Sequence, residues 1–184
     1  MTYDGGGLPS PPKTYQNTAY DFFTRIGSPR LVVAPMVDGS ELPYRMLCRR
    51  YGAELAYTPM MKAGYCVHNH DDYFPQHFTT CPEDRPLIAQ FCANREEDLV
   101  AAAQFVEPHV DAIDLNLGCP QSVAEKEYFG AFLMDNLRLV RSLVTTLAAH
   151  VTVPVTCKIR RFDDVAHTVS YAQMLVDSGC QLLA

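Results

Sequence analysis

Short apolar segments alternate with helix-like segments along most of this chain, and this alternation constrains its fold more than any other feature. The predicted strands are nearly continuous apolar runs, which is typical of parallel strands buried on both faces. We expect strands at residues 31–34, 54–58, 87–91, 112–116, 153–159 and 181–184, helices at 42–51, 60–67, 95–105, 131–150 and 164–178, and a long polar loop at 69–85. The pattern predicts an α/β fold in which helices cover a parallel sheet.

Two architectures fit this pattern, an open doubly wound sheet and a (β/α)8 TIM barrel. No GxGxxG motif follows the first predicted strand, which argues against a dinucleotide-binding open sheet. Polar residues instead recur at the predicted strand ends, namely Asp38, Gln90, Asn116 and Lys158. Because the C-terminal strand ends of a barrel meet on one rim, these side chains should converge there. We therefore predict a TIM barrel. Since that fold typically needs about 250 residues, we expect it to be truncated in about the sixth strand.

Composition restricts the compartment and the class of partner. Residues 1–18 are rich in Gly and Pro, which predicts a flexible N-terminal tail ahead of a catalytic domain at 19–184. Neither an 18-residue apolar run nor a secretory signal is present. Seven cysteines without a CxxC pair favour a reduced intracellular protein, cytoplasmic or nuclear, over a disulfide framework or a zinc site. The net charge of −6 argues mildly against a nucleic-acid partner.

The residues that could take part in catalysis or ligand binding lie at the predicted rim. The sequence NLGCP at 116–120 places the Cys119 thiol at the end of a buried strand, ahead of a helix predicted to start near Gly130. A structural cysteine would more naturally lie inside the strand, so this context favours a working thiol. Gln90 can donate to and accept from the edge of a ring, and Lys158 can stand beside a ring that becomes anionic on reduction. The alternatives remain a strand-end hydrogen bond for Gln90 and a solvated charge for Lys158.

The sequence resembles the dihydrouridine synthases, flavin enzymes that reduce uridine in tRNA. The resemblance rests on APMVDGSELPYRMLCRRYGAELAYTPMM, RPLIAQFCAN, DAIDLNLGCPQ with GAFL behind it, and PVTCKIR, and it spans residues 32–184. Two of these stretches look most like the eukaryotic class that acts on the adjacent uridines sixteen and seventeen of the tRNA D-loop. The resemblance implies FMN and NADPH as cofactors and tRNA as partner, with no membrane, no metal and a monomeric complete protein.

The resemblance also implies a role for each rim residue. Pro35, Met36 and Val37 would contact FMN. Gln90 would bind the pyrimidine edge of the flavin, and Lys158 would stabilise its reduced anion. Asn116 would position the target base, and Cys119 would be the general acid. Apart from the resemblance, the position of Arg160 and Arg161 after the fifth predicted strand suggests a contact with tRNA phosphate. Hydride would pass from FMN to C6 of uracil while Cys119 protonates C5. An ordinary thiol, with a pKa of about 8.5, carries its proton at neutral pH and can serve as such an acid.

The sequence departs from the pattern of the family in two places. Relatives tend to be basic after the cysteine, whereas here Glu125 and Glu127 oppose Lys126. The chain also ends before the family's flavin-binding histidine, the late-strand loops and the helical tRNA-binding domain. Alone it is therefore expected to be inactive and poorly soluble. The competing hypotheses are another FMN-dependent barrel acting on a free pyrimidine, and an inactive truncated fragment.

The remaining charged and sulfur side chains are expected to be structural. On the first helix Arg45, Arg49 and Arg50 should form a solvated face. A second polar group, consisting of His68, His70, Asp71 and Asp72, is predicted to lie in a solvated loop rather than to bind metal. The other six cysteines, Cys48, Cys66, Cys81, Cys92, Cys157 and Cys180, are interpreted as core or incidental thiols.

Overall fold

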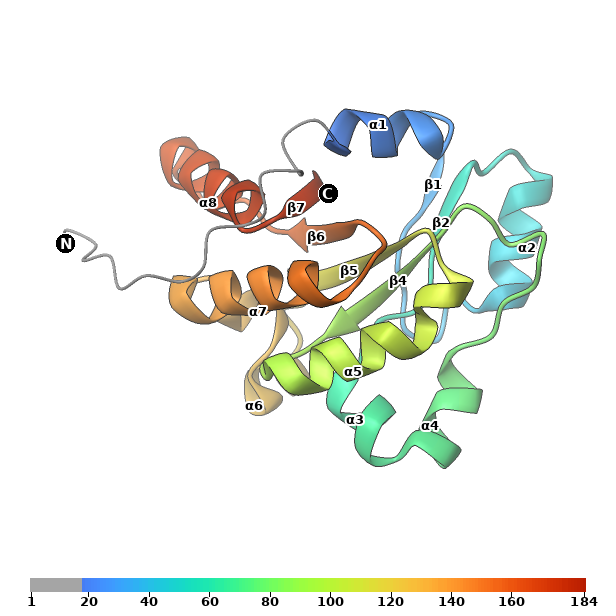
Figure 1. The fold of residues 1–184 in the computed structure, drawn as a ribbon, viewed down its shortest axis with the longest axis horizontal. Helices are drawn as coiled ribbons and strands as arrows, with labels where there is room; N and C mark the ends of the chain where they lie inside the picture. The colour runs from blue at the N-terminus through green and yellow to red at the C-terminus, as the bar shows by residue number, and fades with distance from the viewer. Residues whose placement is uncertain (1–17) are drawn as a thin grey trace.

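The computed structural model describes residues 18–184, so the predicted tail at 1–18 lies outside the described residues apart from Thr18. One parallel sheet of seven strands forms the centre of the molecule (Figure 1). Its order is β1-β2-β4-β5-β6-β7, and β3 pairs beside β4. The strands are β1 (Val32–Val33), β2 (Leu55–Tyr57), β3 (Met61–Lys62), β4 (Leu87–Cys92), β5 (Ala112–Leu117), β6 (Val155–Ile159) and β7 (Cys180–Leu183). The predicted fold class is confirmed: this is the half-barrel sheet of a (β/α) barrel.

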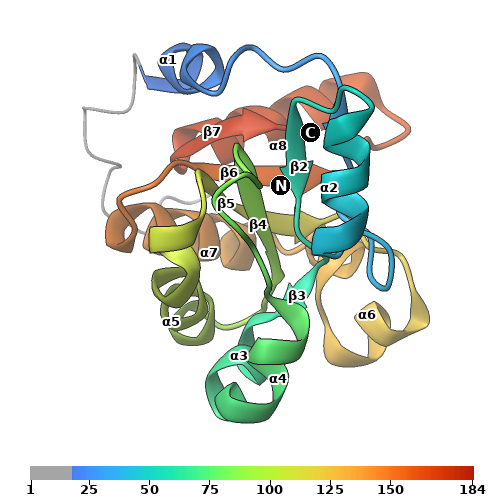
Figure 2. The same ribbon diagram turned by 90° about the vertical axis from the view of Figure 1, so that its right-hand side faces the viewer.

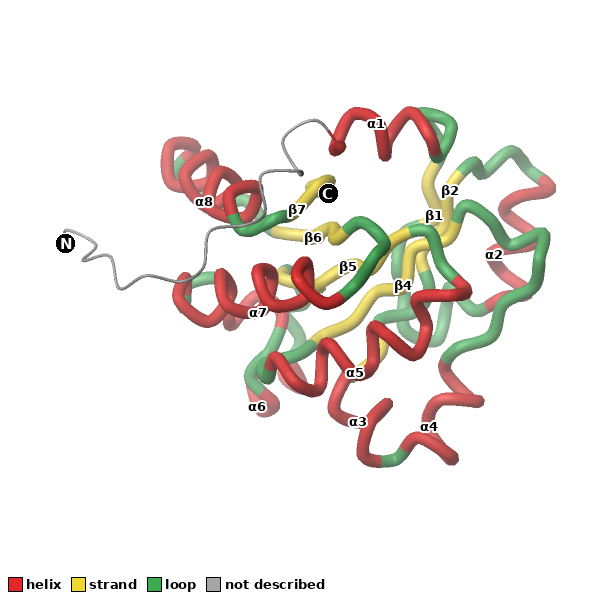
Figure 3. The backbone as a smooth tube through the Cα atoms, in the orientation of Figure 1, coloured by secondary structure: helices red, strands yellow, loops and turns green. Residues whose placement is uncertain are grey.

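Helices connect the strands and cover the outside of the sheet (Figure 3). They are α1 (Thr18–Arg25), α2 (Leu42–Arg50), α3 (Ala63–His68), α4 (His70–His77), α5 (Glu96–Val106), α6 (Ser122–Glu127), α7 (Leu137–His150) and α8 (Val165–Asp177), with short 3-10 turns at Glu107–His109 and Gly130–Leu133. Two of them have side-chain N-caps, Asn136 for α7 and Asp164 for α8. None of the described helices is long and apolar enough to cross a membrane.

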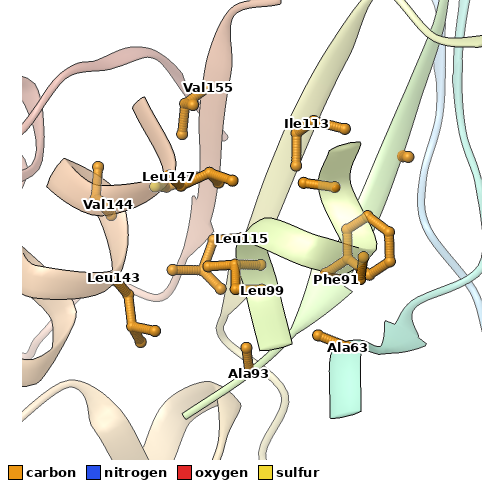
Figure 4. Close-up of a cluster of buried hydrophobic side chains, with 14 of the residues drawn as sticks. Ala63, Phe91, Ala93, Leu99, Ile113, Leu115, Leu143, Val144, Leu147 and Val155 are labelled. Atoms are coloured by element: carbon orange, nitrogen blue, oxygen red, sulfur yellow. The ribbon is translucent and has the colours of Figure 1, made fainter. Parts of the chain in front are cut away.

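The core lies between the sheet and the helices α5 and α7. Every residue of β4 is buried, and in β5 only Asn116 is partly exposed. Figure 4 shows the side chains of Leu115 and Val155 on the strands packed against Leu99 of α5 and Leu147 of α7. These continuous apolar strands explain why the alternation in the sequence predicted the sheet correctly.

The two ends of the sheet have different roles. Helix α1 lies across one end (Figure 2). Its residues Phe22 and Ile26 are buried in one cluster with Leu55 and Ile88. Both partners lie at or near the N-terminal ends of their strands, so α1 covers the N-terminal end of the sheet. Helix α6 lies at the opposite, C-terminal end, which is the end where a barrel of this type carries its active site.

Several sequence-based element predictions were wrong in detail. The predicted loop at 69–85 contains α4, because Phe74 is buried in an aromatic cluster with Phe78 and Phe105 that stabilises the helix. The predicted helix at 60–67 divides into β3 and α3. The predicted helix at 131–150 divides at residues 134–136, and α7 begins only after its Asn136 cap. Helices α1 and α6 were not predicted.

Candidate active site

All eight residues predicted for the site line one open cavity at the C-terminal end of the sheet. The cavity has a volume of about 360 Å³, within the range of small-molecule sites. Its walls include Pro35, Met36, Val37, Gln90, Asn116, Cys119, Lys158 and Arg160. Asp38, the remaining polar residue predicted at the rim, is exposed and does not line the cavity. The predicted convergence of strand ends therefore holds for Gln90, Asn116 and Lys158 and fails for Asp38.

Each wall comes from a different strand end. The loop after β1 supplies residues 35–37, β4 supplies Gln90, and β5 with its following loop supplies Asn116 and residues 118–121. Strand β6 supplies Lys158, and Arg160 follows it directly. Gln90 pairs in register with Asp114, and Asn116 pairs with Lys158. The parallel sheet thus brings together residues as far apart in the sequence as Pro35 and Arg160.

Asp114 lies under the cavity and is completely buried. Its two carboxylate oxygens accept hydrogen bonds from Thr156 Oγ1 at 2.6 Å and from Gln90 Nε2 at 2.8 Å. Burial raises the pKa of Asp114 to about 6, while the bonds from Thr156 and Gln90 and the charge of Lys158 act in the opposite direction. The carboxylate is therefore mainly ionised at neutral pH despite its burial.

The amide of Asn116 connects this carboxylate to the cysteine loop. Asn116 Nδ2 donates to Gln90 Oε1 at 3.0 Å. Its Oδ1 accepts from the backbone N–H groups of Gly118 at 3.1 Å and Cys119 at 2.9 Å. A continuous series of hydrogen bonds therefore runs from Asp114 through two amides to the backbone of Cys119.

The backbone around Cys119 is tightly enclosed. Gly130 has φ of +64°, and a Cβ atom there would lie 2.7 Å from the carbonyl oxygen of Cys119. That oxygen accepts the N–H of Ala131 at 3.0 Å. On the other side, Arg160 Nε donates to the carbonyl of Gly118 at 2.5 Å. The residue at 130 must therefore be glycine for the chain to pass this close to the thiol-bearing residue.

A second set of contacts holds α6 against the rim. Lys62 Nζ, at the end of β3, forms an ion pair with Glu127 Oε1 at 2.6 Å. Asn94 Nδ2 donates to the Glu127 carbonyl at 2.9 Å. The negative charge of Glu127, which in the sequence opposes that of Lys126, is thus paired with Lys62.

The expectation of a solvated arginine face on α2 was wrong for two of the three residues. Arg45 is only 1% exposed and donates to Asp84 Oδ2 from Nε at 2.9 Å and from Nη2 at 2.7 Å. Arg49 Nε donates to Asp84 Oδ1 at 3.1 Å, and only Arg50 is exposed. The buried Asp84 supplies the counter-charge that the sequence pattern of α2 alone did not reveal.

Arg45 also fixes one wall of the cavity. Its Nη1 donates to the carbonyl of Ser40 at 2.6 Å. Ser40 Oγ in turn accepts the N–H of Met36 at 2.9 Å and donates to the Met36 carbonyl at 3.2 Å. The loop that presents Met36 and Val37 is therefore held from behind by a buried charge.

The other polar and sulfur groups have structural surroundings. His68 pairs with Asp98 at 3.1 Å, and His70 packs edge-on to Phe105. Within the described part of the chain no cluster of three His, Cys, Asp or Glu residues could hold a metal ion. All seven cysteines are free thiols, and Cys66, Cys92, Cys157 and Cys180 are buried while Cys48, Cys81 and Cys119 are partly exposed.

Sequence reasoning overlooked Asp114, although a signal for it was available. Asp114 and Asn116 are two residues apart in a strand, so their side chains lie on the same face. A carboxylate inside an apolar strand, on the face of a predicted site residue, indicates a buried partner for that residue. Arg45 and Asp84 offered no comparable signal, because 39 residues separate them.

The fold and the site together define a parallel (β/α) half-barrel in which a thiol, two amides and a lysine line one cavity at the C-terminal rim of the sheet. Comparison with known families gives the particular one: a family described as dihydrouridine synthase (Dus) matches residues 32–184. The chain belongs to the dihydrouridine synthase family.

Curated relatives support the same assignment. The chain is 48% identical over 170 residues to the tRNA-dihydrouridine(16/17) synthase [NAD(P)(+)] of Saccharomyces cerevisiae, covering 90% of this chain and 40% of the relative. It is 50% identical over 167 residues to the corresponding synthase-like protein of Mus musculus, covering 89% and 35%. A tRNA-dihydrouridine(20a/20b) synthase-like protein of Homo sapiens is 40% identical over 151 residues, covering 80% and 47%. The chain thus spans less than half the length of each of these relatives.

Proposed function

We propose that the protein containing this chain reduces uridine to 5,6-dihydrouridine in the D-loop of tRNA, with FMN and NADPH as cofactors. The observation that carries the proposal is the convergence of Cys119, Gln90, Asn116 and Lys158 on one cavity in a member of this family. The preference for uridines 16 and 17 is supported by the higher identity to synthases named for those positions than to one named for 20a and 20b.

The donor set suits a flavin ring. Met36 and Val37 are exposed apolar side chains at the cavity wall, against which a flat ring can lie. Gln90 has one N–H and one oxygen lone pair beyond its bonds to Asp114 and Asn116, and these match the mixed donor and acceptor edge of a pyrimidine ring. Lys158 places a positive charge beside that edge. When bound and reduced, FMN supplies the hydride that reaches C6 of the uracil.

Cys119 is proposed to supply the proton for C5. Its backbone is fixed on both sides, by Asn116 at the N–H and by Ala131 at the carbonyl, so the side chain is the part left to act. The thiol is only partly exposed and packs against the apolar cluster that contains Cys92, Ala124 and Phe129. A proton held at this position can reach the base without competing strongly with bulk water.

Asn116 and Arg160 are proposed to receive the substrate. Asn116 has one Nδ2 hydrogen beyond its bond to Gln90, which suits a carbonyl oxygen of the base. Arg160 uses its Nε for the Gly118 carbonyl, so a contact with tRNA phosphate would come from its two terminal nitrogens. The target base must leave its stack to reach this site, which costs a few kcal/mol.

The test compares the complete gene product with its Cys119→Ala variant on unmodified tRNA with NADPH, reading dihydrouridine by position. Cys81→Ala is the matched control, because Cys81 is also partly exposed but contacts Met46 and does not line the cavity. We expect product at adjacent D-loop uridines that disappears only in Cys119→Ala. Reduction of free pyrimidine without any tRNA product would refute the proposal in favour of another FMN-dependent barrel.

A further inference from the structure

The hydrogen bonds beneath the cavity form a series with only one allowed direction. At one end is the Asp114 carboxylate, which when ionised can only accept. At the other end are the backbone N–H groups of Gly118 and Cys119, which can only donate. Between them lie the side-chain amides of Gln90 and Asn116, each of which could in isolation be turned either way.

The two ends together fix both amides. Gln90 must turn its nitrogen toward Asp114, which leaves its oxygen facing Asn116. Asn116 must then turn its nitrogen toward Gln90 and its oxygen toward the cysteine loop. Reversing either amide would place N–H against N–H or oxygen against oxygen at buried contacts, which is strongly unfavourable.

We propose that Asp114 is a positioning residue for this site: acting through Gln90 and Asn116, it fixes which hydrogen-bonding groups face the cavity and where the backbone of Cys119 lies. This inference rests on the proposed function and adds to it a residue that does not line the cavity. It also defines the ligand edge. Gln90 and Asn116 each have one N–H beyond the series, so with both amides held in one direction the site can donate to two carbonyl oxygens of a ring.

The surroundings of Asp114 agree with this role. The groups that interact with it electrostatically are Lys158 and Cys157 on β6 and Tyr57 on β2, and of these Lys158 carries the compensating charge. With its pKa at about 6, the carboxylate is mainly ionised at neutral pH, the state that imposes one direction on the series. Once protonated, it gains an O–H that can donate, and the constraint on Gln90 is lost.

The experiment uses the complete gene product with Asp114→Asn, which keeps the shape of the side chain. Asp111→Asn is the matched control, because Asp111 lies just before the same strand, where it accepts from the N–H of Leu87 and pairs with Arg85. Initial rates on tRNA are measured across pH, together with the rate at which iodoacetamide alkylates Cys119, which needs neither flavin nor tRNA.

We expect Asp114→Asn to lower kcat at least about tenfold with little change in KM for tRNA, since displacement of a reacting group acts on the chemical step. Wild-type kcat should fall below about pH 6, and the variant should lack this acid limb. Cys119 alkylation should change in Asp114→Asn and stay at the wild-type rate in Asp111→Asn. A wild-type kcat and pH profile in Asp114→Asn would overturn the inference.

One further variant and the alkylation rates keep the test decisive. If Asp114→Asn does not fold, Thr156→Val removes one donor to the carboxylate while leaving the series intact, so the acid limb should move to higher pH. An unmoved limb would overturn the role of Asp114. If wild type forms no dihydrouridine, the proposed function fails. The alkylation rates then decide the inference separately, because equal rates in wild type and Asp114→Asn would refute it.

Discussion

Substitution of Gly130 by alanine tests how closely the chain must approach Cys119. The new Cβ would lie 2.7 Å from the Cys119 carbonyl oxygen, 3.0 Å from its Cβ and 3.1 Å from its nitrogen. Ordinary contact begins at 3.4 Å, so the cysteine loop must move by about 0.7 Å. That movement also strains the bond from the Ala131 N–H to the Cys119 carbonyl.

The expected effects on stability and rate follow from these distances. Alanine in the left-handed region costs about 1–2 kcal/mol, and overpacking a buried position adds roughly 1–3 kcal/mol. A loss of about 2–5 kcal/mol in the free energy of unfolding is therefore expected for Gly130→Ala. Because misplacement of a reacting group by about 1 Å can cost a hundredfold in rate, kcat should fall by at least about tenfold.

Gly27→Ala separates the backbone contribution from the steric one. Gly27 has φ of +91°, but nothing lies within 4 Å of its would-be Cβ. Denaturant unfolding and single-turnover dihydrouridine formation would be compared for both variants of the complete gene product. Equal losses of stability in the two variants, with kcat unchanged in Gly130→Ala, would refute the reasoning that close packing on Cys119 requires glycine.

Three other perturbations test separate parts of the structure. The pKa of Asp114 rises from 3.8 to about 6 on folding, so its contribution to stability is greatest below the unfolded pKa and is lost as pH rises through the folded one. Between about pH 4 and pH 7 the free energy of unfolding of wild type relative to Asp114→Asn should therefore fall by about 2 kcal/mol. Parallel pH curves from denaturant unfolding would contradict this. Asp84→Asn should lower the free energy of unfolding by about 3–5 kcal/mol, because it leaves the Arg45 guanidinium buried without a carboxylate. A loss under about 1 kcal/mol in denaturant unfolding would mean that the pair is not truly desolvated. Lys62→Met should lower the free energy of unfolding by only about 0.2–1 kcal/mol, because its ion pair with Glu127 is partly exposed. It should nevertheless speed amide hydrogen exchange in α6. Unchanged exchange would show that this ion pair does not hold the helix.

The sheet could be predicted from the sequence because its signal is local. Six of the seven strands lie within two residues of their predicted bounds, since each is a short apolar run between polar or helical segments. Strand β3 was missed because its two residues, Met61 and Lys62, carry no such run. The barrel rim followed from the sheet, since parallel strands bring their C-terminal ends together whatever lies between them.

The errors arose where distant residues decide the structure. Helix α4 contains Pro75 and a polar sequence, and the burial of Phe74 against Phe105 stabilises it. The burial of Arg45 depends on Asp84, which belongs to another segment. Neither partner can be identified from spacing along one element, so both arrangements needed the folded chain to become apparent.

The hydrogen-bonded series beneath the cavity has a consequence for how this protein can evolve. Its side chains come from three strands. Each side chain keeps its hydrogen bonds only while its neighbours keep their roles as donor or acceptor. A single Gln90→Glu change, conservative by most measures, would place a second carboxylate beside Asp114. A substitution at one of these positions therefore requires compensating substitutions at the others. Relatives whose sequences differ widely elsewhere should keep this small group of residues together.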